Sequence, residues 1–82
     1  MSTQDHNARV PLAFLLPGAR AHIDTLGDDI DPTQREQIIA YGLAPGRALT
    51  VLQQRPMTLV MVDEVELALE ETVARHVWVT RR

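Results

Sequence analysis

The sequence predicts a mainly β fold: a small β-barrel of about five strands, with one short α-helix and a helical turn. The chain has 82 residues, enough for one domain around one core. In several short segments apolar residues alternate with polar ones, a pattern typical of half-buried strands. Glycine and proline pairs separate these segments, and closure into a barrel would leave no exposed strand edge.

The N-terminal part is predicted to contain a tail and a short apolar segment. Residues 1–9 are polar and do not alternate, so we expect a disordered tail before a domain at 10–82. Residues 11–16 are apolar and end at Pro17-Gly18. This pattern indicates a turn or helical segment that packs against the core.

The first predicted strand covers residues 19–26. Apolar and polar side chains alternate along it, so one set should face the core and the other the solvent. Gly27 and the two aspartates after it end the strand. We expect Ala19, Ala21 and Ile23 inside, and Arg20, His22 and Asp24 outside.

A helix is predicted from Pro32 to Tyr41. The Asp31 carboxylate can accept hydrogen bonds from the free N–H groups of the first turn, proline suits the first helical position, and Gln34 follows at capping-box spacing. Gly42 can end the helix in the left-handed conformation, which a residue without a side chain adopts at no steric cost.

A structural corner is predicted at Gly42, Pro45 and Gly46. In residues 43–46 the proline fixes φ and Gly46 tolerates a positive φ, as in a type II turn. The next strand is expected at 48–54.

Residues 58–69 predict a hairpin with Asp63-Glu64 at its tip. Directly opposed residues of a hairpin share one face of the sheet, and five of the six on one face are apolar, so they are expected in the core. A short helical turn at 70–76, with Val73 inward, and a last strand at 77–79 should complete the domain. The opposed residues are Thr58, Val60, Val62, Val65, Leu67 and Leu69.

The other face of this hairpin is unusually apolar, because it carries Leu59, Met61 and Ala68 beside Glu66. Two interpretations are open. The helix at 32–41 covers these side chains, or they form a partner-binding surface, since an uncovered apolar patch usually marks an interaction site. An exposed hairpin face or edge strand could also support a weak homodimer.

Composition excludes several classes of protein. The net charge is −3, since 11 acidic residues outnumber 8 basic ones, so no nucleic-acid partner is expected. No apolar run approaches the roughly 18 residues of a membrane span, and the polar N-terminus lacks the apolar core of a signal peptide. We therefore expect a protein without direct membrane insertion, and the absence of cysteine fits a reducing, cytoplasmic environment.

No catalytic group of residues stands out. Cysteine is absent, Ser2 is the only serine, and the four glycines cannot form a phosphate-binding loop. We expect no enzymatic activity and no required cofactor.

Candidate metal ligands are His22, Asp24 and His76, which offer imidazole and carboxylate donors that suit Fe²⁺. Their spacing matches no H-x-x-x-H or calcium-loop pattern. We therefore expect at most weak binding of Fe²⁺ or adventitious binding of Zn²⁺, and His22 is equally explained as an exposed residue of an alternating strand.

The order of these elements resembles the FeoA family of small SH3-like barrels over residues 11–79. The most specific part is a Gly-Leu-x-Pro-Gly element before a strand, here residues 42–46. The chain departs from the family pattern at Glu64, where a glycine is common, and at Glu70, where arginine is usual. Other matching residues are Pro11-Leu12, Leu16-Pro17-Gly18, Leu49-Thr50-Val51-Leu52, Pro56, Leu67-Ala68-Leu69, Ala74 and Val77-Trp78-Val79.

The resemblance implies a cytoplasmic accessory or regulatory protein of ferrous iron uptake. Such a protein would act by protein–protein contact with the transporter FeoB, whose soluble part hydrolyses GTP while its membrane part passes Fe²⁺. The alternative is a stand-alone SH3-like module related to the C-terminal domain of metal-dependent repressors, which would sense a metal or bind a peptide. A shared barrel does not by itself decide between these functions.

Overall fold

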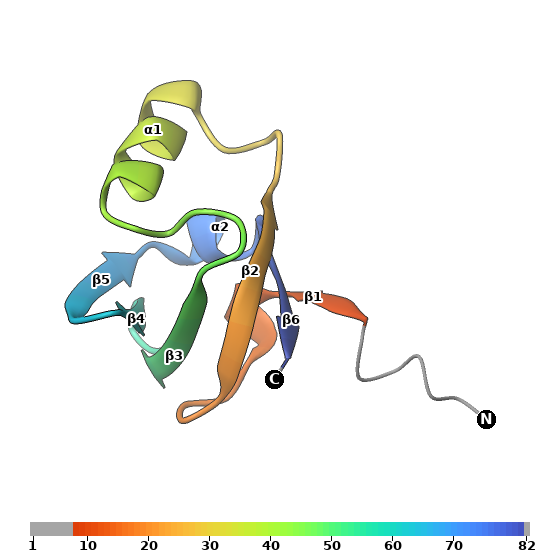
Figure 1. Ribbon diagram of the computed structural model, residues 1–82, viewed down its shortest axis with the longest axis vertical. Helices are drawn as coiled ribbons and strands as arrows, with labels where there is room; N and C mark the ends of the chain where they lie inside the picture. Colours follow the sequence, from red (N-terminus) through yellow and green to blue (C-terminus); the bar gives the residue numbers. More distant parts are fainter. Residues whose placement is uncertain (1–7, 82) are drawn as a thin grey trace.

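The computed structural model describes residues 8–81, so most of the predicted tail at 1–9 lies outside the described residues. Six antiparallel strands form one sheet in the order β1-β6-β2-β3-β4-β5, which curls around a single core (Figure 1). The mainly β class is confirmed. The elements are β1 (Arg9–Pro11), the 3-10 helix η2 (Leu12–Phe14), β2 (Arg20–Leu26), α1 (Pro32–Ala40), β3 (Ala48–Gln53), β4 (Thr58–Val62), β5 (Val65–Leu69), α2 (Glu71–Ala74) and β6 (Val77–Arg81).

The strand that the sequence did not predict is β1. Arg9, which we assigned to the tail, pairs with Thr80 of β6, and Val10 pairs with Val79. The strand is short and ends in a proline, so it shows no alternation of its own. The expectation that a closed barrel would leave no strand edge is wrong, because β1 and β5 are the two ends of the sheet.

Strand β2 joins the two halves of the sheet, because it pairs with β3 on one side and β6 on the other. Ala21 and Ile23 are buried as predicted. The register with β6 shifts between Ile23 and Thr25, so Leu26 rather than Thr25 faces the core. A bulge of this kind bends a strand and increases its twist.

Helix α1 begins as predicted. The Asp31 carboxylate accepts hydrogen bonds from the N–H groups of Thr33 at 3.1 Å and Gln34 at 3.3 Å. The Arg35 guanidinium fastens the loop before the helix, because it donates to the carbonyl oxygens of Gly27 at 2.7 Å and Leu26 at 3.4 Å. The first turns of α1 are therefore tied to the end of β2.

The helix ends in a Schellman motif at Gly42, which has a φ of 108°. The Leu43 N–H donates to the Ile38 carbonyl at 3.1 Å, and both side chains are buried. Gly46 has a φ of 92°, and the Arg47 N–H donates back to the Ala44 carbonyl at 3.1 Å, as the predicted type II turn requires.

The predicted hairpin register is confirmed, from Val62 opposite Val65 at the tip to Thr58 opposite Leu69 at the open end. Asp63 takes a φ of 56° in the turn and forms an ion pair with Arg47. One core residue was wrongly predicted: Val65 is 42% exposed, because it follows the tip on an edge strand that has a neighbour on one side only.

A hydrogen-bonded glutamine joins the N-terminal segment to the hairpin. The Gln54 side-chain amide donates to the carbonyl oxygens of Leu12 at 3.0 Å and Leu15 at 2.6 Å. The Thr58 hydroxyl, on a residue only 1% exposed, donates to the Gln54 side-chain oxygen at 2.7 Å. One side chain thus satisfies three polar groups that lie beside the core.

The predicted helical turn is α2, whose Val73 and Ala74 are buried. The core combines the inward side chains of the strands with residues from η2, α1 and α2. Its members are Leu12, Leu15, Ala21, Ile23, Leu26, Ile30, Ile38, Leu43, Leu49, Val51, Val60, Val62, Leu69, Val73, Ala74, Val77 and Val79.

Replacing Gln54 by leucine is expected to destabilise the fold by about 2 kcal/mol, because the Leu15 carbonyl and the Thr58 hydroxyl lose the side chain that they bond to. Urea unfolding followed by tryptophan fluorescence measures this loss. Gln53→Leu is the matched control, since no hydrogen bond of its side chain is found among the described residues. Equal unfolding midpoints for the two variants would contradict the role assigned to Gln54.

Candidate interaction surface

The side of the hairpin and of β3 that points away from the core carries four apolar side chains. We call this set the outer face: Leu52, Leu59, Met61 and Ala68. Ala68 is exposed and Leu52 is 40% exposed, whereas Leu59 and Met61 are half-buried. Across the strands Leu59 lies opposite Ala68, and the register of β3 shifts at Leu52. The sheet therefore presents these apolar side chains next to one another on its outer side.

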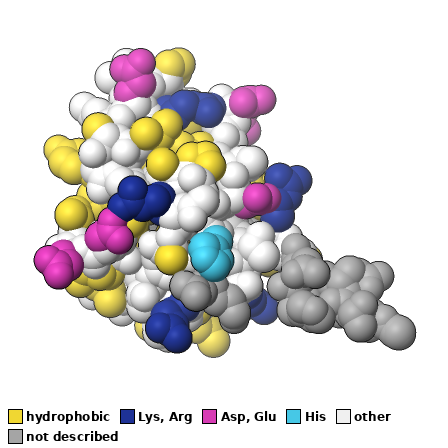
Figure 2. Space-filling model, viewed as in Figure 1, with side chains coloured by type: hydrophobic (Ala, Val, Ile, Leu, Met, Phe, Trp, Pro, Cys, Tyr) yellow, Lys and Arg dark blue, Asp and Glu magenta, His cyan; other side chains and the backbone are white. Residues whose placement is uncertain are grey.

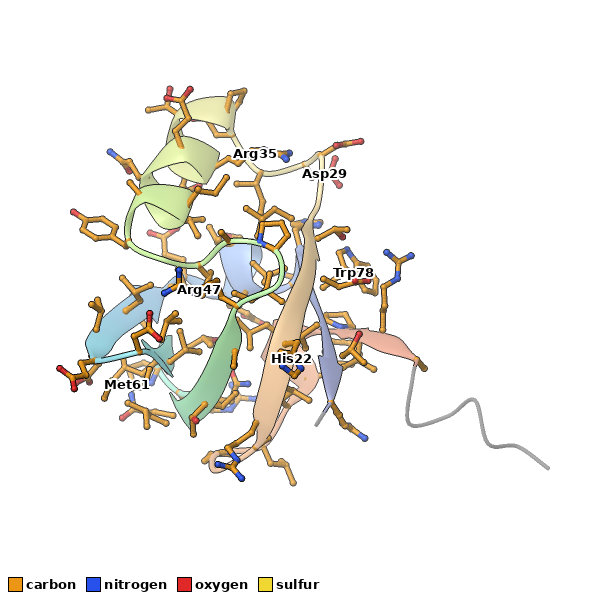
Figure 3. All side chains as sticks on the ribbon, viewed as in Figure 1. His22, Asp29, Arg35, Arg47, Met61 and Trp78 are labelled. Carbon is orange, nitrogen blue, oxygen red and sulfur yellow. The ribbon has the colours of Figure 1, made fainter. Side chains whose placement is uncertain are left out.

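Helix α1 is not the cover of Met61. Met61 lines a shallow hollow of about 200 Å³ with Arg20, Ala48, Leu49, Thr50 and Asp63, none of which belongs to the helix. In the common view of the figures, α1 lies above the hairpin and Met61 points away from it on the lower side (Figures 1 and 3).

The surroundings of the outer face are polar. Glu66 lies opposite Met61 on β5 and is exposed, and the ion pair of Arg47 with Asp63 lies at the hairpin tip. Arg20 lines the same hollow as Met61. An apolar centre with a polar rim is the usual arrangement of a protein–protein interface.

The structure does not bring the candidate metal ligands together. His22 and Asp24 are exposed on β2, and the Asp24 carboxylate forms an ion pair with Arg9 at 3.3 Å. His76 lies beyond the other end of β2, where the Gly27 N–H donates to its carbonyl oxygen and the Asp29 carboxylate lies 3.7 Å from its ring. Figure 3 shows His22 and Asp29 toward opposite ends of β2. Five residues of extended chain separate His22 from Gly27, roughly 15 Å.

Across residues 8–81, no group of three or more histidine, cysteine, aspartate or glutamate side chains is placed to hold a metal ion. The corner residues Gly42, Pro45 and Gly46 provide backbone geometry. They set the exit of α1 and its return to β3, and the Gly46 N–H donates to the Ile23 carbonyl at 2.8 Å. Their contribution to any site is thus structural.

A wider open hollow of about 510 Å³ lies where β1 meets the end of β2. Trp78 and Arg9 are among its lining residues, together with Thr25, Leu26, Gly27 and Asp28. Sequence reasoning missed it, because it depends on the unpredicted strand β1. Its charged groups are engaged in ion pairs: Arg9 with Asp24, and Asp28 with Arg35 at 3.8 Å.

No helix within the described part of the chain is both long and apolar enough to cross a membrane.

Comparison with known proteins identifies the family. The family model described as the FeoA domain matches residues 10–81. No curated protein sequence matches the chain. Among solved structures, an iron uptake regulatory protein (FeoA) is 24% identical with a TM-score of 0.79, and the match covers 92% of this chain and 99% of that one.

Two further structures share the fold. The FeoA protein of Stenotrophomonas maltophilia, solved with zinc and described as a prokaryotic SH3 domain protein, is 19% identical with a TM-score of 0.75, covering 87% of this chain and 93% of that one. A manganese-dependent transcriptional repressor is 22% identical with a TM-score of 0.83, and the match covers 93% of this chain but 43% of the repressor.

At these identities the structures establish an SH3-like fold, as the resemblance implied, and the family model establishes the relationship. With nearly its whole length matched by that model, this chain belongs to the FeoA family of ferrous iron transport.

Proposed function

We propose that this chain is a cytoplasmic accessory protein of ferrous iron uptake that regulates the transporter FeoB by direct contact with its GTP-hydrolysing part, and that it is not an enzyme. The observation that carries this proposal is the outer face. It is apolar, partly exposed and bordered by charged residues, and its Met61 lines a hollow to which helix α1 contributes no residue.

Family membership supports a role in iron transport. The family model that matches the chain is that of the FeoA domain, which favours an accessory protein over a repressor-related sensor. The Stenotrophomonas maltophilia relative is described as a candidate activating factor of ferrous iron transport, which agrees with a regulatory role.

A function by contact also agrees with the distribution of charged groups. The carboxylates lie on exposed surface, and several are engaged in ion pairs, as in Asp24 with Arg9 and Glu71 with Arg75. General acid–base chemistry needs titratable groups gathered in a cleft around a substrate. The sequence has no cysteine and its only serine is Ser2. No serine lines the two larger hollows of the described residues.

Within this proposal the partner binds across Leu59, Met61 and Ala68. Met61→Lys is expected to weaken association with the soluble domain of FeoB by at least about tenfold, because a charge is buried at the centre of the interface. Isothermal titration calorimetry measures this change, with GTP hydrolysis followed in parallel.

The matched control is Ile39→Lys, which replaces an apolar residue on α1 that is 41% exposed. It should bind FeoB like the wild-type protein. If Met61→Lys unfolds the chain, the outer face is part of the core. If the wild-type protein neither binds FeoB nor changes its GTP turnover, the proposed function is rejected.

We further propose that the chain requires no metal and that any Fe²⁺ or Zn²⁺ binds weakly at separate histidines. The zinc in the Stenotrophomonas maltophilia structure belongs to that protein. Here His22 is remote from the pair formed by His76 and Asp29.

Calorimetric titration with Zn²⁺, and with Fe²⁺ under anaerobic conditions, tests this separation. His22→Ala is expected to remove only the metal bound at His22, and His76→Ala only the metal bound near Asp29, because the two sites share no ligand. A single stoichiometric site that disappears in both variants would contradict independent binding.

A further inference from the structure

Strand β5 is an edge strand with a free row of backbone groups. In a hairpin with a two-residue loop, the residues that flank the loop form a hydrogen-bonded pair, and such pairs then alternate along the strands. Val65, Leu67 and Leu69 therefore bond to β4, whereas Glu66 and Ala68 direct their N–H and C=O groups away from the sheet. Among the described residues, no backbone hydrogen bond occupies these groups.

A groove runs between this edge and helix α1. It has a volume of about 160 Å³ and is lined by Gln34, Gln37, Ile38 and Tyr41 of the α1 region and by Leu67, Ala68 and Leu69 of β5. Of the β5 residues, Leu67 and Leu69 are on the inner side of the sheet. Tyr41 is 61% exposed, so part of the groove's apolar wall faces solvent. A strand added next to β5 would place the side chain opposite Leu67 on this inner side, since opposed residues share a face.

The outer side of the same edge is acidic. Glu66 lies within β5, and Glu64 and Glu70 flank it; all three are exposed. Of the ion pairs between described residues, none involves these three carboxylates. Figure 2 shows acidic side chains beside hydrophobic ones at the hairpin side of the molecule. The edge therefore favours a basic residue opposite Glu66.

These charges disfavour a second copy of the chain as the occupant. In an antiparallel pair of two β5 strands, a two-fold axis at Glu66 places Glu66 opposite itself. An axis at Leu67 places Glu64 opposite Glu70, and an axis at Ala68 places Glu66 opposite Glu70. Like charges directly opposite one another destabilise a sheet, so each central register carries a repulsive pair.

We propose that the edge of β5 binds an extended segment of another protein in which apolar and basic residues alternate. The segment adds a seventh strand: its backbone pairs with Glu66 and Ala68, an apolar side chain enters the groove opposite Leu67, and a basic side chain faces Glu66. This surface uses the strand's backbone rather than the outer face, and the inference is independent of FeoB as a partner.

The test uses two short capped peptides, TVKVKVT and its charge-reversed counterpart TVEVEVT, with the full chain. Fluorescence anisotropy measures affinity, and hydrogen exchange measures protection of individual amides. We expect TVKVKVT to bind at least about tenfold more tightly than TVEVEVT at low salt, with new protection at the amides of Glu66 and Ala68.

Two variants test the geometry. Ala68→Pro removes one outward N–H without breaking a bond to β4, which an edge strand tolerates, and should weaken TVKVKVT by at least about tenfold. Glu66→Lys should abolish the preference for TVKVKVT even if the proline variant does not fold. Asp29→Lys, on the opposite side of the molecule from β5 in the common view of Figures 1 and 3, is the charge control and should keep the preference.

The proposal is overturned if TVKVKVT does not bind, if the two peptides bind equally well, or if protection appears away from β5. It is also overturned if Asp29→Lys changes the preference as much as Glu66→Lys does. In that case net charge, rather than the strand edge, would determine binding.

Discussion

The fold depends on strand β2, which must pair on both sides while facing a single core. Its residues 20–22 pair with β3 and its residues 21–26 pair with β6, so it connects the two halves of the sheet. Regular alternation would turn Thr25 inward and Leu26 outward. The bulge after Ile23 corrects this placement and adds the bend that lets one continuous sheet wrap around its own core.

Much of the fold could be predicted because the responsible signals are local. The cap at Asp31, the glycine at position 42 and the hairpin tip at 63–64 each depend on a few neighbouring residues, and the structure confirms all three. Strand β1 could not be found in this way, because it exists only through its pairing with β6. The exposure of Val65 could not be predicted either, since alternation shows which face a residue is on but not which strand is at the edge of the sheet.

The candidate surfaces divide in the same manner. The apolar outer face follows from alternation in the hairpin, so Leu59, Met61 and Ala68 could be named from the sequence. The separation of His22 from His76 required the pairing of β2 with β6, which places the two histidines at opposite ends of a strand. The groove beside β5 combines residues from α1 and from the hairpin, about thirty positions apart in sequence, and no local pattern connects them.

The hydrogen bonds of Arg35 have a mechanical consequence for that groove. Because they fasten α1 to the terminus of β2, one wall of the groove moves with the centre of the sheet. The other wall is the edge strand β5, which pairs only with β4, and β4 in turn pairs with β3. The width of the groove therefore depends on the curvature of the sheet between β2 and β5. A ligand that widens the groove would reduce this curvature and so change the position of β5 relative to β2.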